Sequence, residues 1–357
     1  MPHEPHKRTC VGTGLIVLDI VRSVMGNRAT EKRFAGGSCG NVLAILSYFG
    51  WVANAVGRIG DDQAGRELLR DLGQWGVRTE WLRVESGRAT PVIVQENFLD
   101  AKGRRRHRFS RACPVCGAVL PAYRPLLANE ADALASRLPA HSAFYFDRVA
   151  PGTLDLAKKS RIRGALVVFE PSGIRDQRMF ADCLKVSHIV KYSNERIEGI
   201  HELVAKAKVP VEIETLGARG LRLRVRTNGR PGTSKELAAY PAPEFLDAAG
   251  SGDWCTAGLV QWLLRDGTSV DELVGDVDAV VAAARHGQAL AALNCGFEGA
   301  RGLMYAVGAK RVLDLAGAIV GGRGAAHELA ATKTKRYSEH RSGSTNMVCS
   351  SVLHPHA

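Results

Sequence analysis

Short apolar runs rich in β-branched residues alternate with longer helical patterns along most of the chain. Such runs predict strands that are covered by helices on both faces of a sheet. Strands are predicted at residues 14–21, 51–60, 143–149, 165–170, 188–193 and 211–217. Helices are predicted at residues 40–49, 62–75, 153–160, 176–185, 195–206, 252–265 and 271–293. Because parallel strands need crossover helices, this order predicts a doubly wound α/β domain with a mostly parallel sheet.

Two segments, residues 20–34 and 88–112, interrupt this alternation. Both are polar and charged and lack a helix between them, which is typical of extended strands with one face in water. They either pair as a small sheet over the main domain or form two ordinary loops. After residue 320 the chain is rich in Gly, Ser, Thr, His and Lys without periodicity. We therefore expect a domain over residues 8–320 and a disordered basic tail over residues 321–357.

Composition indicates a soluble, cytoplasmic protein. The 357 residues are 45% hydrophobic, which is sufficient for a large core. The apolar segment at residues 11–21 is too short to span a bilayer, so no membrane partner is predicted. The eight cysteines have irregular spacing, as expected in a reducing compartment.

The net charge of +12 is concentrated in two places. Residues 102–111 contribute +6 and residues 321–357 contribute +3, which leaves +3 for the rest. A local excess does not predict a broad nucleic-acid surface. The cluster at residues 102–111 is either a solvated hairpin tip or a pocket edge that attracts a phosphorylated substrate.

The segment Asp247–Asp253, DAAGSGD, places small residues directly before an apolar helix. Gly250, Ser251 and Gly252 allow a ligand to approach the backbone, and the N–H groups of a first helical turn favour an anion such as a phosphoryl group. Asp253 could then remove a proton from a substrate hydroxyl that attacks the γ-phosphate. The alternative is that Ser251 or Asp253 only caps the helix. Walker A, GxGxxG, HExxH and protein-kinase signatures are absent from the sequence.

Two distant regions together resemble the ribokinase-like (PfkB) carbohydrate kinase family. DAAGSGDWCTAGL is similar to the family's D-[ST]-x-G-A-G-D signature and departs from it at Ala248 and Ser251. Residues 34–77 resemble the first family signature in Gly36, Gly37 and Asn41 and in the run VGRIGDD. They depart from it in the run Ser38-Cys39-Gly40 and at Leu43. Without the family, Gly36 and Gly37 could only form a turn and Asn41 could only cap a helix.

Further segments match the family in the same order between these regions. VVFEPSGIR at residues 167–175 resembles a D-x-N-x-R stretch, and VKYSNE at 190–195 resembles the strand that leads to an N-x-x-E motif. Ile197 stands where that motif has its glutamate, which leaves Glu195 or Glu198 as the magnesium contact. ETLGARG at 214–220 is similar to T-L-G-x-x-G, and residues 292–300 stand where an adenine-side loop is expected.

The resemblance covers roughly residues 10–305 and implies a fold, an activity and a set of site residues. The implied fold is a three-layer α/β domain with a small β-sheet lid built from the two irregular segments. The implied activity is ATP-dependent phosphorylation of a hydroxyl on a sugar or a related polyhydroxylated small molecule, with Mg²⁺ on the ATP phosphates. The residues that contact the substrate would be Asp19 at the end of the first strand, Gly36, Gly37, Asn41 and Asp147. The residues that contact the nucleotide would be Asn194, Thr215, Gly217, Gly220 and Asn294. The catalytic group would be Gly250, Ser251, Gly252 and Asp253. The alternatives are a nucleoside kinase of the same fold, or a catalytically silent member that senses a nucleotide or binds nucleic acid.

The family does not explain Cys113 and Cys116, whose CxxC spacing is that of half a tetrahedral zinc site. A second CxxC is absent from the sequence, so the simpler interpretation is two reduced structural cysteines. A homodimer through the lid could complete a four-cysteine site with one pair from each chain.

Overall fold

The computed structural model describes residues 8–25, 28–103, 105–114, 116–227, 229–230 and 232–323. Nine strands form one large sheet in the order β13-β12-β11-β10-β9-β8-β1-β4-β5. Its pairings are parallel except for β11 with β12 and β12 with β13. The strands are β1 (Thr9–Thr13), β4 (Val52–Gly60), β5 (Leu82–Glu85), β8 (Ala143–Phe146), β9 (Leu166–Phe169), β10 (Ile189–Ser193), β11 (Val211–Thr215), β12 (Leu221–Val225) and β13 (Lys235–Leu237). This confirms the predicted doubly wound, mostly parallel sheet.

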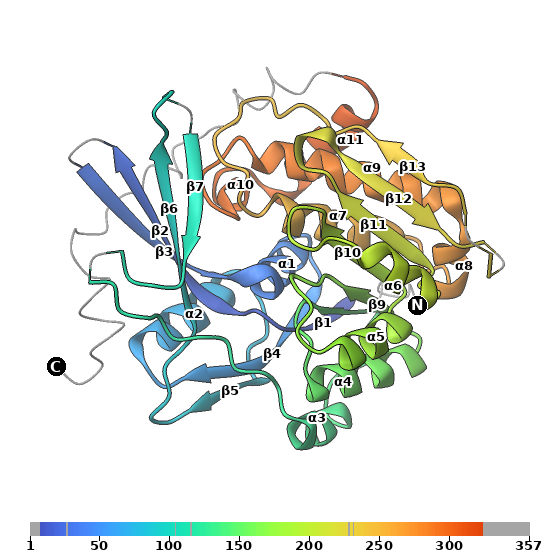
Figure 1. The fold of residues 1–357 in the computed structure, drawn as a ribbon, viewed down its shortest axis with the longest axis horizontal. Coiled ribbons are helices and arrows are strands. Elements are labelled where there is room, and N and C mark those ends of the chain that lie inside the picture. The colour runs from blue at the N-terminus through green and yellow to red at the C-terminus, as the bar shows by residue number, and fades with distance from the viewer. Residues whose placement is uncertain are drawn as a thin grey trace, which may run out of the picture.

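Helices cover both faces of this sheet and form the outer two layers (Figure 1). One hydrophobic cluster packs α1 (Gly37–Tyr48), α2 (Gln63–Gln74), α7 (Ser251–Leu263), α8 (Val270–Gly275), α9 (Val277–Asn294), α10 (Gly302–Ala306) and α11 (Ala309–Val320). A second cluster packs α3 (Ala128–Ala135), α4 (Pro151–Ile162), α5 (Gln177–Val186) and α6 (Ile200–Lys206). Because the strands between them are buried on both faces, they carry the continuous apolar runs seen in the sequence.

A separate four-stranded sheet stands beside the large one, at the upper left of Figure 1. Its order is β3-β2-β6-β7, and we call it the lid. The strands are β2 (Val17–Met25), β3 (Arg28–Gly36), β6 (Val92–Leu99) and β7 (Arg105–Ser110). Residues 20–34 and 88–112 therefore pair as a small sheet, and the alternative of two ordinary loops is wrong.

The predicted first strand at residues 14–21 is wrong. The first strand of the large sheet is β1, and the apolar run continues through a turn into β2 of the lid. The turn forms because Gly14 has φ +143° and the Asp147 carboxylate accepts the Leu15 N–H at 2.8 Å. Asp19 consequently lies within a lid strand and does not close a strand of the main sheet.

Other differences concern short elements. Helix α6 begins only at Ile200, after a left-handed Gly199, and the predicted helix 271–293 is two helices that meet at Asp276. The Asp276 side chain accepts N–H groups of α9, which explains the break as a helix cap. The sequence pattern also missed β5, β12, β13, α3, α10 and α11. Of these, β5 and β13 are edge strands and α10 has five residues, and such elements carry little periodic signal.

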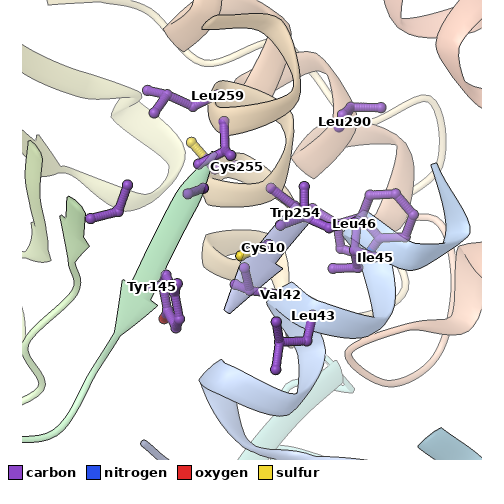
Figure 2. Packing of buried hydrophobic residues seen from close by; sticks show 14 of the residues in the cluster. Cys10, Val42, Leu43, Ile45, Leu46, Tyr145, Trp254, Cys255, Leu259 and Leu290 are labelled. Atoms are coloured by element: carbon purple, nitrogen blue, oxygen red, sulfur yellow. The ribbon is translucent and has the colours of Figure 1, made fainter. Parts of the chain in front are cut away.

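Packing between α1 and α7 fixes the two signature regions against one another. Figure 2 shows Trp254 of α7 beside Leu46 and Ile45 of α1, with Leu290 of α9 nearby. Trp254 is fully buried and donates its indole N–H to the carbonyl of Ala300 at 3.0 Å. Since Asp253 precedes Trp254, this contact sets the position of the expected base.

No helix in the described part of the chain is long and apolar enough to cross a membrane. The expected tail at 321–357 falls almost entirely outside the described residues, which end at 323.

Candidate active site

The amide of Asn41 contacts the carboxylate of Asp253 directly. Asn41 Nδ2 donates to Asp253 Oδ2 at 2.7 Å, and both side chains are buried. Asn41 lies inside α1, and the N-cap of α7 is Gly250, whose φ is +73°. Neither side chain is a helix cap, so the capping alternatives for Asn41 and Asp253 are wrong. The structure thus brings together two expected site residues that are 212 positions apart in the sequence.

The environment of Asp253 raises its pKa from 3.8 to about 7. Burial of the carboxylate is the largest cause, and the neighbouring negative charge of Glu170 adds to it. The hydrogen bond from Asn41 and the positive charges of Lys191 and Arg196 oppose the rise and lower the pKa. A carboxylate with a pKa near neutrality suits a general base.

An ion pair between Glu170 and Lys191 lies against the first turn of α7, and the sequence analysis did not single it out. Lys191 Nζ donates to Glu170 Oε1, and the hydroxyl of Thr256 donates to Glu170 Oε2 at 2.6 Å. A Cβ added at Gly252 would lie 3.5 Å from Glu170 Oε1 and 3.6 Å from Lys191 Nζ. Glu170 directly follows β9, and Lys191 lies in the middle of the neighbouring parallel strand β10. The position of Glu170 at a strand end was the available signal.

Gly250 occupies a position where a larger residue would interfere, whereas a Cβ at Gly252 would make only ordinary contacts. A Cβ at Gly250 would lie 2.3 Å from the carbonyl oxygen of Ala300. The N–H of Ser251 donates to the carbonyl of Ala248 at 3.2 Å and so closes the turn before the helix. The backbone N–H groups in the first turn of α7 have no acceptor within the helix and point beyond its N-terminal end. They form a suitable anion site beside Asp253.

Asp247 links this turn to the lid. Its Oδ1 accepts the N–H of Ala249 at 2.9 Å, and its Oδ2 accepts the N–H of Gly299 at 2.9 Å and the amide of Gln95 at 2.8 Å. His107 Nδ1 lies 3.1 Å from Asp247 Oδ1. Burial raises the pKa of Asp247, but His107 and the two backbone N–H groups lower it more, so the net pKa is below its usual value.

A cavity of about 550 Å³, which includes space open to solvent, lies between the lid and the large domain. Asp19 of β2 and Asn41 of α1 both line it. Burial raises the pKa of Asp19 to about 7, against a hydrogen bond from the Gly37 N–H and the charge of Arg301. A Cβ at Gly36 would lie 1.9 Å from Asp19 Oδ2, so glycine is required for this close approach. The cavity also has lining residues that the sequence analysis did not find, namely Lys32, Phe34, Gln95, Glu298, Arg301 and Tyr305.

Asp147, the fifth expected substrate residue, holds the turn between β1 and the lid. Its Oδ1 accepts the N–H of Leu15, and its Oδ2 lies 3.1 Å from Arg148 Nη1. Burial raises the pKa of Asp147. The predicted contact of Asp147 with a substrate stays a prediction.

The expected nucleotide residues gather where β10 and β11 end. The N–H of Asn194 donates to the carbonyl of Thr215 at 3.2 Å, and Gly217 and Gly220 have φ of +60° and +108° in the turn that follows. Asn294 is separate from them: its Nδ2 donates to the carbonyl of Ala249 at 3.0 Å, so its amide supports the turn before α7. Nucleotide contact by these residues stays a prediction.

The expected metal contacts have different surroundings. Ile197 is buried in the second hydrophobic cluster. Glu195 is exposed and lies beside Gly217, since a Cβ added at Gly217 would be 3.8 Å from Glu195 Oε1. Cys113 is buried and Cys116 is exposed. Within the described ranges, no three His, Cys, Asp or Glu residues are grouped so that they could hold a metal ion.

Two arginines of the cluster at residues 102–111, Arg106 and Arg108, lie on the outer face of the lid. His107 and Gln95 point toward Asp247, so the alternation along a strand turns Arg108 to the other face, where its Nε donates to Glu96 at 2.6 Å. Arg106 is exposed, 3.3 Å from Asp100. For these two side chains the geometry favours a solvated hairpin over a pocket edge.

The layered α/β sheet, the lid over a cavity and a glycine-rich helix start with a buried carboxylate are together the features of a ribokinase-like fold. Residues 8–106 match the family model described as pfkB family carbohydrate kinase. A fructokinase from Vibrio alginolyticus is 23% identical over 71% of this chain and 83% of its own length. An ATP-dependent ribose-1-phosphate kinase from Halopiger xanaduensis is 28% identical over 76% of this chain and 84% of its own. The crystal structure of a fructokinase with bound ATP from Xylella fastidiosa has a TM-score of 0.67 at 20% identity and covers 87% of this chain and 98% of that one. The chain therefore has a ribokinase-like fold, and its residues 8–106 are similar to the pfkB family of carbohydrate kinases.

Proposed function

We propose that this protein transfers the γ-phosphoryl group of ATP to a hydroxyl of a sugar or a related polyhydroxylated small molecule. The contact between Asn41 and Asp253 carries this proposal, because it joins the wall of the cavity to the base at the helix start. A substrate in the cavity would thus present a hydroxyl to Asp253. The family model and the named kinases that this chain resembles support the same activity.

In this mechanism Asp253 accepts the proton of the attacking hydroxyl, and Asn41 holds its carboxylate in a fixed orientation. The N–H groups of the first turn of α7 stabilise the negative charge on the transferred group. Lys191 adds positive charge next to Gly252, although its pairing with Glu170 neutralises part of it. The lid excludes water and so disfavours hydrolysis of ATP.

The nucleotide would lie over the ends of β10 and β11, near Asn194, Thr215 and Gly217. Mg²⁺ neutralises the ATP phosphates in phosphoryl transfer, and Glu195, which is exposed beside Gly217, would be its contact from this chain. A cytoplasmic location, a homodimer through the lid and a zinc site at Cys113 and Cys116 stay predictions.

A nucleoside acceptor is the second candidate, favoured by one observation. Phe34 and Tyr305 both line the cavity, with ring centroids 5.3 Å apart, and could contact a nucleobase. The intact base and its hydrogen bond from Asn41 disfavour a catalytically silent protein.

A coupled assay of ADP formation tests the proposal. Purified protein would be incubated with MgATP and, separately, with pentoses, hexoses, sugar acids, sugar phosphates and nucleosides. We expect ADP formation that depends on one class of acceptor and a phosphorylated product detectable by mass spectrometry. ADP formation independent of every acceptor, or none at all, would contradict the proposed activity.

A further inference from the structure

Arg301 is a buried residue of the cavity wall that the expected mechanism does not use. Its exposed fraction is 3%, and it directly precedes α10. One terminal nitrogen, Nη2, donates to the carboxylate of Asp71 and to the carbonyl of Ala35. The other, Nη1, has no hydrogen-bond partner among the described residues. A buried guanidinium donor without an acceptor is unfavourable, so this atom is suited to an acceptor atom that a ligand supplies.

Three elements hold the guanidinium in one orientation. Asp71 of α2 accepts the N–H of Ala35 on β3 at 2.7 Å and the hydroxyl of Tyr305 on α10 at 2.9 Å, in addition to Arg301. Burial lowers the pKa of Arg301, but the charge of Asp71 raises it more, so the net pKa is raised and the group stays charged. A fixed donor of this kind can discriminate between ligands because it cannot turn to another partner.

Asp19 lies close to the same donor. It lines the same cavity, and the charges of Asp19 and Arg301 shift one another's pKa. For the Asp19 carboxylate, the hydrogen bond described within the protein is a long one, 3.4 Å from the Gly37 N–H. A hydroxyl group both donates and accepts, so one hydroxyl can donate to Asp19 and accept from Arg301.

Both cationic side chains that line the cavity in the described part of the chain already have an acidic partner. Arg301 is paired with Asp71, and Lys32 is paired with Glu298 at 2.7 Å. Among the described charged residues that line the cavity, Asp19 is the one that belongs to neither ion pair. An added phosphate or carboxylate would therefore meet a second negative group without a spare cation, and burying such an unpaired charge is unfavourable.

We propose that Arg301 is a specificity-determining residue of the proposed kinase: its Nη1 donates to an acceptor hydroxyl that in turn donates to Asp19, which selects an uncharged polyol. The acceptor class is then an unphosphorylated sugar or the ribose of a nucleoside. This rests on the proposed function, which left sugar phosphates open.

The test compares wild type with Arg301→Lys. Lysine keeps the positive charge beside Asp71 but loses the second terminal nitrogen, whereas Arg301→Gln would leave Asp71 unpaired and could fail to fold. The matched control is Arg178→Gln, at an exposed arginine on α5. Probes are D-fructose, D-ribose and inosine as neutral acceptors and D-ribose 5-phosphate as an anionic one. For the best neutral probe we expect Arg301→Lys to raise KM roughly 10- to 100-fold, the range of one hydrogen bond to a charged group. KM for ATP should be unchanged, and the control should behave as wild type.

Monodeoxy derivatives of that probe identify the hydroxyl. The derivative that lacks the bridging hydroxyl should be used equally poorly by wild type and Arg301→Lys, while the other derivatives retain the difference. An equal loss with every derivative would indicate a structural role and overturn the proposal, as would a wild-type preference for D-ribose 5-phosphate.

Direct binding separates this inference from the proposed function. Stabilisation by each probe would be measured as the shift in Tm without ATP, for both proteins. If neutral probes stabilise wild type more than Arg301→Lys but no phosphorylation occurs, the proposed kinase activity fails and the role of Arg301 in binding stands. If wild type phosphorylates D-ribose 5-phosphate but neither binds nor phosphorylates a neutral probe, the proposed kinase activity stands and the role of Arg301 fails. If wild type neither binds nor phosphorylates any probe, neutral or anionic, both proposals fail.

Discussion

Substitution of Asp253 by asparagine should remove catalysis while leaving the fold intact or more stable. The new side chain has nearly the same shape, and its amide oxygen can accept the hydrogen bond that Asn41 donates to Asp253 at 2.7 Å. What is lost is the ability to accept a proton. Loss of a general base lowers kcat by roughly 10²- to 10⁴-fold.

The stability of Asp253→Asn follows from the pKa of about 7. In the unfolded chain the carboxyl ionises near pH 4, whereas the folded protein keeps the proton until about pH 7. The buried carboxylate therefore destabilises the fold increasingly as pH rises from about 4 to 7. At about 1.4 kcal/mol for each pKa unit, ionised Asp253 lowers the free energy of unfolding by roughly 4 kcal/mol. Above pH 7 the variant should gain up to that amount, and at pH 4 it should match wild type.

Two measurements check these expectations. Coupled ADP formation gives kcat, with the exposed Asp314→Asn on α11 as a control, and urea unfolding at pH 4, 6 and 8 gives the free energy of unfolding. For wild type, kcat/KM should fall about tenfold per pH unit below 7 as the base is protonated. Activity within tenfold of wild type in Asp253→Asn would refute the assignment of the base. A variant that is less stable at pH 8 would refute the account of its burial.

Three further predictions follow from other contacts of the site. Asn41→Ala should raise the pKa of Asp253, because the hydrogen bond from the Asn41 amide lowers that pKa. The acidic limb of the pH profile of kcat/KM should therefore move to higher pH. An acidic limb at the same pH as in wild type would contradict this prediction. Gly250→Ala should lower the free energy of unfolding, measured in urea, by about 1–3 kcal/mol, because φ is +73° and the new Cβ would lie 2.3 Å from the Ala300 carbonyl oxygen. Gly267→Ala, at an equally left-handed but open position, should lower the free energy of unfolding by less. Glu298→Gln should loosen the lid, because Glu298 accepts hydrogen bonds from Ser23, Lys32 and Asn97, which lie on three strands of the lid. Amide hydrogen exchange in β2, β3 and β6 should become faster. Unchanged exchange would argue against this role of Glu298.

The sequence by itself determined the class of fold and the position of the expected base. Short apolar runs that alternate with helical patterns are typical of parallel strands between helices, so the layered sheet was predicted from this order. The small residues before Asp253 were compatible with a close backbone approach or with a helix cap, and the resemblance of a second, distant region to the same family favoured the first. The family resemblance placed Asp19, Asn41 and the lid segments in order along the chain.

Contacts between distant residues were decided only by the tertiary structure. Asn41 could have been a cap until the packing of α1 on α7 placed it against Asp253. The apolar run at 14–21 reads as one strand because periodicity does not show the turn that the buried Asp147 stabilises. Arg301 had no motif around it, and its role depends on which buried charges surround it. Pairing of charges and closure of a cavity are properties of positions in space, and residue order along the chain does not encode them locally.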